Sequence, residues 1–528
     1  MSIDTAPSRI GAAPRRARAT LRGLVGLGGL LGLAYGSAHG GQARAITAVA
    51  LARASYDWLQ FDGGPQHSGD NTRETTLTSA TVARLRPLFT VALPGIADGA
   101  PVLLRAVPTA HGTRDLLFLT TTNGHIVARD AHTGATVWGR QYGPGPCRIN
   151  NVGGPCYTTS SPAIDPNRRY VYSYGLDGKV HKYAVGSGDE VRRGGWPETI
   201  TLKGYNEKES PALATVTDRA GHTYLYAANG GYPGDQGDYQ GHVTIINLTS
   251  GAQRVFNTDC SNQAVHFVEA PGTPDCPAVR GAVWARPTMV YDAATDRIYL
   301  GVGRGTFDPA RHDWADSILA LHPDGTGVVG GPLDSYTPAN YLQLDAADHD
   351  LGSTSPALLP VPQASRVRRL AAQAGKDGLL RLLNLDNLSG QGGPGHTGGE
   401  VQVLPVPQGG TTLPTPAVWV NPRDGSAWLF VANYQGISGL RLTVDGGLPR
   451  LHPMWTDAVG DRTSPLVAGG VLYVAGGTTL QALDPTTGRA WWGTTIGSIH
   501  WASPLVANGV LYMADGDAAL RAYSLAGR

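Results

Sequence analysis

Two groups of carboxylates could bind a metal cation. Asp345, Asp348 and Asp350 form one acidic cluster, and Asp235 and Asp238 lie in a glycine-rich run. Carboxylate oxygens are the ligands that Ca²⁺ prefers in proteins. Acidic loop residues are more often simply solvated, and that is the favoured interpretation of both groups. The 15 histidines show no spacing with Ser or Cys that predicts a catalytic triad.

The four cysteines fall into two local pairs, Cys147 with Cys156 and Cys260 with Cys276. Four cysteines allow three connectivities, and two local disulfides, each inside one long loop, are the preferred prediction. Each would stabilise the fold by roughly 3 kcal/mol through loop closure. The alternative is a redox-active pair. No Cys-x-x-Cys-His motif for attached haem and no zinc-like Cys/His spacing occurs. Structural disulfides favour an extracytoplasmic location.

The elements that position these residues come from an internal repeat. Eight segments begin with a small or polar residue and a proline, then continue as an aliphatic and aromatic run. The prolines are Pro101, Pro162, Pro211, Pro287, Pro356, Pro416, Pro465 and Pro504. Repeats of about 40 to 75 residues that each hold several short strands are typical of a β-propeller or a solenoid.

A second pattern, Ala-x-Asp-x-x-Thr-Gly-x-x-x-Trp, begins at Ala128 and again at Ala482. The Asp carboxylate can accept hydrogen bonds from backbone N–H groups of a turn, and Gly can adopt a positive φ there. The Trp is predicted to fill the space between neighbouring sheets, because aromatic residues dominate buried area.

Twisted four-stranded sheets pack face to face around an axis. The sequence therefore predicts an all-β fold, an eight-bladed β-propeller of four-stranded antiparallel blades. The last repeat ends at Leu525 one strand short. A strand within residues 87–93 is expected to pair with this last blade, which closes the ring and removes an exposed sheet edge.

The N-terminal stretch 1–45 is predicted to be an export signal. The apolar run Gly23–Ala34 is followed by the small-x-small sequence Ala43-Arg44-Ala45 and preceded by Arg15, Arg16, Arg18 and Arg22. A single anchoring helix is the alternative, although the run is short and rich in Gly. The paired Arg15-Arg16 leaves the export route open. After signal removal no membrane span is expected.

The remaining chain is divided into a lead-in segment, 46–86, and the propeller, 87–528. The whole sequence has a formal charge of +1, and without residues 1–45 this becomes about −4. This balance gives no reason to expect a nucleic-acid partner. A charged fraction of 16% with 72 Gly and 37 Pro fits many tight turns rather than disorder. A monomer is expected.

With these repeats the chain resembles the quinoprotein alcohol dehydrogenase-like superfamily, whose repeats take their name from pyrroloquinoline quinone (PQQ). The resemblance covers roughly residues 56–528, and Trp58–Asp62 with Ser68–Asn71 is similar to the start of those proteins. It implies the propeller fold. It says little about activity, because the same fold serves dehydrogenases and envelope assembly scaffolds.

The resemblance also implies a cofactor position. In family dehydrogenases the quinone lies over a Trp in the central funnel, and Trp284 matches that residue. Lys376, in Gly375-Lys376-Asp377-Gly378, matches the cation that contacts the quinone. A stacking face with a cation at its rim suits a flat anionic ligand.

The calcium and acid–base positions of the family match poorly. The Glu ligand falls at Gln236, beside Asp235 and Asp238, and the Asn ligand falls at Arg304. The catalytic Asp falls at Arg311, with Asp308 and Asp313 close by as candidate bases. A guanidinium can neither ligate Ca²⁺ nor act as a base.

Two functions follow. The first is an exported ligand-binding or scaffold propeller with a degenerate quinoprotein site, in which Arg304, Arg311 and Lys376 near Trp284 form a cationic funnel for a small anion. Its partner could also be an envelope or extracellular protein. The second is a PQQ- and calcium-dependent alcohol or sugar dehydrogenase, with Asp308 or Asp313 as the base. Action through rim loops alone is a third possibility.

Overall fold

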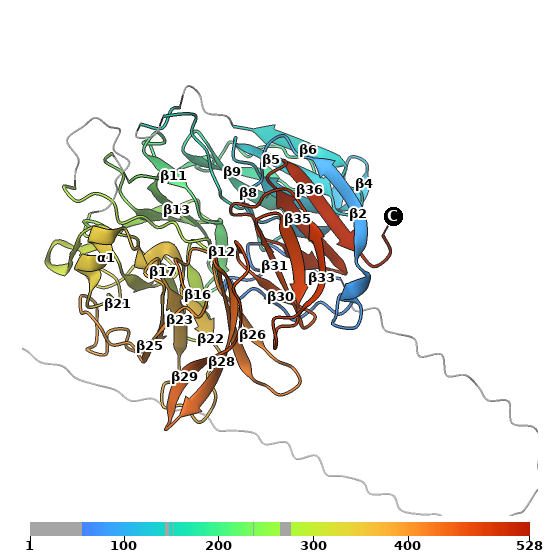
Figure 1. Cartoon of the computed structure of the whole chain (residues 1–528). Helices are drawn as coiled ribbons and strands as arrows, with labels where there is room; N and C mark the ends of the chain where they lie inside the picture. Colours follow the sequence, from blue (N-terminus) through green and yellow to red (C-terminus); the bar gives the residue numbers. More distant parts are fainter. Residues whose placement is uncertain (1–54, 143–146, 151–152, 236, 264–275, 528) are drawn as a thin grey trace, which may run out of the picture. The chain divides into compact units, whose positions relative to one another are not determined.

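The computed structural model describes residues 55–142, 147–150, 153–235, 237–263 and 276–527. In it, each repeat proline stands at the start of a sheet. The predicted export signal, 1–45, and Gln236 lie outside these residues. The described chain forms an eight-bladed β-propeller of antiparallel sheets, as the repeat predicts (Figure 1). Blade eight ends within a few residues of the C-terminus.

The first four blades follow one another in the chain. Their strands are β3 (Val102–Thr109), β4 (Gly112–Thr120), β5 (His125–Asp130) and β6 (Thr136–Gln141); β7 (Ala163–Ile164), β8 (Tyr170–Gly175), β9 (Lys179–Ala184) and β10 (Glu198–Thr199); β12 (Ala214–Thr217), β13 (Thr223–Gly231), β14 (His242–Asn247) and β15 (Gln253–Asn257), with β11 (Glu207–Glu209) also on β13; and β16 (Val290–Asp292), β17 (Arg297–Gly301), β20 (Ile318–Leu321) and β21 (Asp334–Tyr336).

The other four blades complete the ring. Their strands are β22 (Ala357–Leu359), β23 (Leu370–Ala374), β24 (Leu379–Asn384) and β25 (Gln402–Pro405); β26 (Ala417–Val420), β27 (Ala427–Asn433), β28 (Gly436–Asp445) and β29 (Leu448–Asp457); β30 (Leu466–Ala468), β31 (Val471–Gly476), β32 (Thr479–Leu483) and β33 (Ala490–Thr495), with β1 (Asp70–Asn71) parallel to β30; and β34 (Leu505–Ala507), β35 (Val510–Asp515), β36 (Ala519–Ser524) and β2 (Arg86–Ala92).

The ring closes as predicted. Strand β2, from the N-terminal side, pairs antiparallel with β36 along six residue pairs and supplies the fourth strand of the last blade (Figure 1). Phe89 of β2 is buried and lies 6.5 Å from the ring of Tyr512. With β2 as its outer strand, blade eight has four strands and the last strand, β36, is not left as a free edge.

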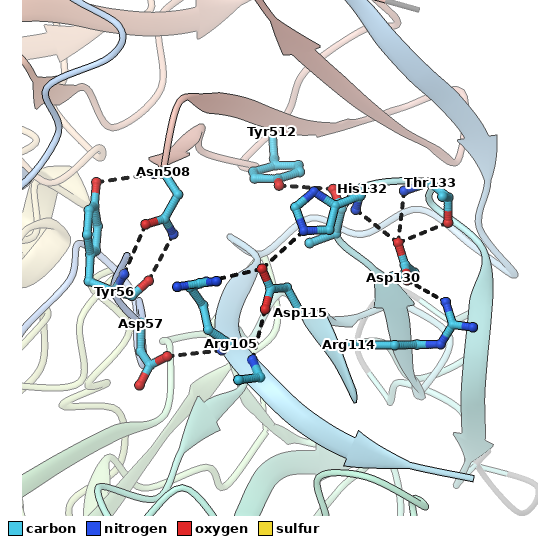
Figure 2. A network of polar contacts seen from close by, with 12 residues as sticks. Tyr56, Asp57, Arg105, Arg114, Asp115, Asp130, His132, Thr133, Asn508 and Tyr512 are labelled. Atoms are coloured by element: carbon cyan, nitrogen blue, oxygen red, sulfur yellow. Dashed lines mark hydrogen bonds and ion pairs between the residues drawn. The ribbon is translucent and has the colours of Figure 1, made fainter. Parts of the chain in front are cut away.

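The repeated Trp residues join neighbouring blades, as expected. Trp138 of blade one donates its indole N–H to the Val185 carbonyl of blade two, at 2.8 Å. Trp492 of blade seven packs edge-on against Tyr523 of blade eight, with ring centroids 5.2 Å apart. Trp455 of blade six, outside the two pattern copies, makes an indole hydrogen bond like that of Trp138, to Pro485 of blade seven at 2.9 Å. The Asp turns are confirmed as well, since Asp130 Oδ1 accepts the backbone N–H groups of His132 and Thr133 (Figure 2).

The lead-in segment from Trp58 to Asn71 crosses the inner strands of the blades. It bonds to the second residue of the first strand in seven blades: Leu103, Ile164, Thr215, Tyr291, Val418, Val467 and Val506. Phe61, in the middle of this segment, is fully buried against Ala100 and Ala212. One end of the axis is therefore plugged by the chain itself.

The start of the described chain also ties the last blade to the first. Asn508 of blade eight exchanges two hydrogen bonds of 2.9 Å with the backbone of Tyr56, and Tyr512 donates to the Ala131 carbonyl of blade one (Figure 2). Asp57 in turn accepts the backbone N–H of Arg105. These contacts supplement the strand pairing at the point of closure.

Both local disulfides are formed, Cys147–Cys156 and Cys260–Cys276. The described residues contain one α-helix, α1 (Tyr341–Ala347), and three short 3₁₀ turns, η1 (Val82–Arg84), η2 (Pro309–Arg311) and η3 (Leu351–Ser353). None of the described helices combines the length and hydropathy that a bilayer crossing requires.

Closure by β2 predicts a large cost for truncating its buried aromatic residue. Phe89→Ala is expected to lower the free energy of unfolding in urea by about 3 kcal/mol, because it leaves a cavity beside Tyr512. Thr90→Ala, on the exposed face of the same strand, is the control and should change it by less than about 0.5 kcal/mol. Equal stabilities for the two variants would contradict closure through β2.

Candidate functional site

The axial hollow is lined by one recurring position of the repeat. Six of the eight residues that stand three places before a repeat proline line the two central cavities: Thr159, Lys208, Trp284, Leu413, Arg462 and Trp501. The position precedes the innermost strand of each blade, so the ring brings these side chains together. Trp284 and Trp501 are thus equivalent residues of different blades.

The larger central cavity has a volume of about 330 Å³. Six of its lining residues are aromatic: Tyr157, Tyr232, Tyr239, Trp284, Tyr434 and Trp501. Cavities of this size with an apolar lining and a few polar groups are typical binding sites for small molecules.

Trp284 and Lys376 meet in this cavity, as the resemblance implies. The Lys376 ammonium lies 5.2 Å from the centroid of the Trp284 ring, which is a cation–π distance. Trp284 in turn stacks on Trp501, with ring centroids 6.3 Å apart and planes inclined by 22°. The two indole planes are thus close to parallel, and the ammonium lies over the Trp284 ring.

Lys376 is held by two carboxylates. Its Nζ lies 2.5 Å from Asp350 Oδ2 and 3.1 Å from Asp348 Oδ1. Burial alone would lower the pKa of Lys376, but the two carboxylates outweigh it and raise the pKa. The lysine therefore stays charged, with its charge largely balanced within the cavity.

Arg304 lies at the centre of the two acidic groups that the sequence separates. Its guanidinium is 3.6 Å from Asp235, 3.9 Å from Asp345 and 3.4 Å from Asp348. Its backbone N–H donates to Asp350 Oδ1 at 2.6 Å. The carboxylates outweigh the effect of burial and raise the pKa of Arg304. Four carboxylates thus converge on one fixed cation.

Below this network lies a buried carboxyl group without a cation in contact. Asp316 is 1% exposed, and its Oδ1 accepts the Leu351 N–H at 3.1 Å. Its Oδ2 has no partner among the described residues. Burial raises the pKa of Asp316 to about 8, with Asp350 and Asp345 adding to the effect. Asp316 is therefore largely protonated at neutral pH.

The opposite wall carries a second lysine. Lys208 lies 4.5 Å from the Tyr157 ring centroid and 5.8 Å from that of Tyr232. Burial lowers the pKa of Lys208 to about 8. The Cys147–Cys156 disulfide packs in the same small cluster as these two tyrosines, so it supports this wall.

His500 and Asp98 form a polar pair at the rim. His500 Nδ1 lies 2.6 Å from Asp98 Oδ2, and Asp98 Oδ1 accepts the backbone N–H of Trp501 at 2.8 Å. The hydrogen bond to Asp98 raises the pKa of His500. Asp98 also stands three places before its repeat proline, so it belongs to the same positional set.

Several sequence-predicted residues lie elsewhere. Arg311 is 75% exposed and pairs at 3.5 Å with Asp308, on the β18 (Phe307–Asp308) and β19 (Asp313–Trp314) excursion from blade four. Asp313 is buried and accepts the Cys260 N–H at 2.8 Å. Asp238 bonds to Asn206. None of these side chains lines the cavity around Trp284.

Potential metal-ligating side chains come together at one place among the described residues. One group, Cys260, Cys276 and Asp313, brings three potential ligand atoms together, but both sulfurs are in the disulfide. Where the resemblance places calcium, the oxygens of Asp235 and Asp348 face the Arg304 guanidinium. A guanidinium cannot ligate Ca²⁺, so the donor set does not fit that ion while Arg304 keeps this place.

Sequence reasoning found Trp284, Lys376, Arg304 and Asp235 of this site, and it missed Lys208, Trp501 and His500. Lys208 and Trp501 carry a readable signal, because each stands at the same offset from a repeat proline as Trp284. Comparing the repeats at that offset would have identified both.

Comparisons with known proteins support the fold. A family model for the outer membrane protein assembly factor BamB (PQQ_2) matches residues 450–528. No curated protein matches the sequence. Among solved structures, the europium-containing methanol dehydrogenase aligns with a TM-score of 0.62 at 14% identity, covering 89% of this chain and 98% of that one. The quinohemoprotein alcohol dehydrogenase from Comamonas testosteroni aligns at 0.60 and 16%, covering 89% and 81%.

The quinohemoprotein alcohol dehydrogenase ADHIIG from Pseudomonas putida HK5 gives a TM-score of 0.60 at 14% identity, covering 89% of this chain and 80% of that one. These matches confirm the resemblance to PQQ-repeat propellers. At such identities they establish the fold, and the activity has to be argued from the cavity.

The raised pKa of Asp316 predicts a pH-dependent stability. In the folded state the Asp316 carboxyl keeps its proton up to about pH 8, whereas in the unfolded state it loses the proton near its usual pKa of about 4. The free energy of unfolding therefore falls as the pH rises from about 4 to 8. Asp316→Asn keeps a side-chain oxygen that can accept the Leu351 N–H, and it removes this pH dependence. The melting temperature of the variant should match that of the parent near pH 5 and exceed it at pH 9.

Asp308→Asn, at a half-exposed carboxylate, is the matched control and should follow the parent at both pH values. A parent and an Asp316→Asn variant with parallel pH profiles would contradict the assignment of a protonated buried carboxyl.

Proposed function

We propose that this protein is an exported PQQ-like propeller that binds a flat anionic molecule of the quinone type in its central cavity, with a degenerate quinoprotein reaction centre. The observation that carries the proposal is the position of Arg304. Its guanidinium lies within 4 Å of Asp235, Asp345 and Asp348, where the resemblance places calcium. The Arg304 guanidinium keeps a positive charge at that position, but it cannot act as a Lewis acid as a metal ion would.

The cavity supports binding of a planar anion. Trp284 and Trp501 offer a stacking face of two indoles, and the lysines Lys376 and Lys208 lie over aromatic rings of the lining. Stacking and charge pairing act together most strongly where water is excluded. Lys376 and Arg304 are already paired with carboxylates, so Lys208 is the cation best placed to meet an anionic group of the ligand.

The second candidate is a PQQ- and calcium-dependent dehydrogenase. The fold of the three dehydrogenase structures and the Trp284–Lys376 pair favour it. PQQ would supply the two-electron acceptor. This chain would then need a carboxylate base at the cavity, and Asp308 and Asp313 lie outside its lining. Asp350 does line it, but it is occupied by Lys376 and the Arg304 N–H. For this reason the binding function is preferred.

The proposed location of the protein is extracytoplasmic. Two formed disulfides favour an oxidising compartment. Residues 1–45 are proposed to direct export and to be removed, 46–86 to lead in to the propeller, and 87–528 to form it. An envelope or extracellular protein remains an alternative partner, which the partial match to the BamB family model favours.

PQQ binding is testable through tryptophan fluorescence. In the parent protein, PQQ is expected to quench emission saturably both in EDTA and in Ca²⁺, with similar affinity. Trp284→Ala should weaken binding at least about tenfold, because stacking on an aromatic face contributes about 1 to 2 kcal/mol or more. Trp492→Phe, in β33 on the outside of blade seven, is the control and should bind as the parent does.

The same samples distinguish the two functions. With PQQ and Ca²⁺ present, the binding proposal expects no dye reduction with alcohols or sugars. Turnover that Trp284→Ala abolishes would overturn it in favour of the dehydrogenase. Absence of any PQQ binding would reject the quinone-type ligand.

A gain of calcium binding is predicted for Arg304→Asn. The variant removes the guanidinium and leaves Asp235, Asp345 and Asp348 close together, a set of oxygen donors that suits Ca²⁺. Without metal its melting temperature should fall, and millimolar Ca²⁺ should restore it. Arg311→Asn, at an exposed arginine, should show no calcium response. A parent protein that is stabilised by Ca²⁺ as strongly as Arg304→Asn would contradict the account.

A further inference from the structure

Arg286 is a charged residue that is buried in the axial core. It is 1% exposed and stands directly before the repeat proline of blade four. Its guanidinium lies between two aromatic rings, 5.2 Å from the Phe61 centroid and 5.4 Å from that of Trp501. It therefore sits between the plug formed by the lead-in segment and the floor of the larger cavity.

The hydrogen bonding of Arg286 is incomplete. Of its donors, Nη1 reaches the Thr159 carbonyl at 3.3 Å, whereas Nε and Nη2 have no partner among the described residues. Burial lowers the pKa of Arg286 to about 10, so the group is still charged at neutral pH. A buried charge without hydrogen-bond partners is costly, and such a group in a native protein usually marks a bound ion or water.

No carboxylate of the described residues lies within ion-pair distance of this guanidinium. Asp98 and Asp62 are the acidic groups that act on it from further away. Asp98 is engaged by His500 and by the Trp501 backbone. Burial raises the pKa of Asp62 well above its usual value, which favours its neutral form. The positive charge of Arg286 is thus not matched by a protein anion in contact with it.

A small cavity of about 10 Å³ adjoins Arg286. Its other lining residues include Arg462 and Trp501, which are 5% and 8% exposed. Arg462 Nε and Trp501 Nε1 are also buried without a partner in the described chain. Among the buried lining residues of this cavity, the side-chain atoms without a partner in the described chain are Nε and Nη2 of Arg286, Nε of Arg462 and Nε1 of Trp501, and all four are donors.

We propose that this cavity is a binding site for one monovalent anion of halide size, held by Arg286, Arg462 and the Trp501 indole N–H on the propeller axis. Four unpartnered donors, three of them on guanidinium groups, suit an anion. The volume of about 10 Å³ corresponds to about one small particle.

The site has a structural consequence. Its three donor residues come from blades four, seven and eight, immediately before the innermost strands β16, β30 and β34. An anion there joins three blades from inside the ring and supplies a counter-charge for Arg286. Arg462 is also held from its other side, where Nη2 donates to Gln481 at 2.9 Å and lies 3.7 Å from Asp457. It also lies against Trp501, whose ring is part of the floor beneath the larger cavity.

Bromide is the direct probe. Crystals of the full mature protein grown in sodium bromide are expected to show one anomalous peak within about 3.5 Å of the Arg286 and Trp501 donors. Density at that place without anomalous signal, which means water, would overturn the proposal. A carboxylate of a copurified ligand reaching the two arginines would overturn it as well.

Thermal unfolding gives a second, independent readout. At constant ionic strength, replacing sodium gluconate by sodium chloride should raise the melting temperature of the parent by about 2 °C or more, because binding stabilises only the folded state. Arg286→Met keeps an apolar chain between Phe61 and Trp501 and should lose this difference. Arg311→Met, at a solvent-exposed arginine, should retain it.

Arg462→Gln provides a further variant in case Arg286→Met does not fold. It removes one unpartnered donor and should raise the chloride concentration needed for half of the stabilisation at least about tenfold. Identical melting in chloride and gluconate for the parent protein would contradict the site.

Discussion

The rest of the structure depends on one run of hydrogen bonds from the lead-in segment to the inner strands of the blades, five made by its backbone and two by the side chains of Gln60 and Asn71. Trp58–Asn71 bonds to seven of the eight blades, and β2 then completes blade eight. Because these contacts hold the first strand of each blade at a fixed distance from the axis, they also fix the side chains that precede those strands. The central cavities are built from that set of side chains.

The electrostatics of the cavity follow from this geometry. Asp235, Arg304, Asp348 and Lys376 are distant in sequence, and the ring brings them into one network in which every charge has an opposite neighbour. A metal ion would normally balance such a group of carboxylates. Here an arginine and a lysine balance it. Under the proposed function, this arrangement separates ligand binding from metal chemistry. Arg286, deeper on the axis, lacks such a balance, and this is why an external anion is inferred there and not at the floor.

Much of the fold could be predicted from the sequence, because the segment that predicts a blade occurs eight times. The spacing of Pro101 to Pro504 predicts the blades, and the missing strand after Leu525 predicts closure by β2. The local cysteine pairs predict both disulfides. Trp284 and Lys376 could be placed together because both sit in segments that resemble those of quinoproteins.

The finer site could not be predicted in the same way. Arg311, Asp308 and Asp313 were expected near Trp284, but they belong to the β18–β19 excursion, whose direction no repeat determines. Arg304 and Asp348 lie in connections between blade strands, where the repeat pattern gives no register. Lys208 and Trp501 could have been predicted from the sequence. Each stands three places before a repeat proline, and this position faces the axis in most blades although its residue type varies.

The central claim is that Arg304 holds the place of a catalytic cation. The most direct measurement is a crystal structure of the protein grown with PQQ and millimolar Ca²⁺, with anomalous data that identify calcium. The account predicts PQQ over Trp284, the Arg304 guanidinium between Asp235 and Asp348, and no calcium peak beside it. A calcium ion ligated by those carboxylates, with the Arg304 side chain displaced, would contradict it.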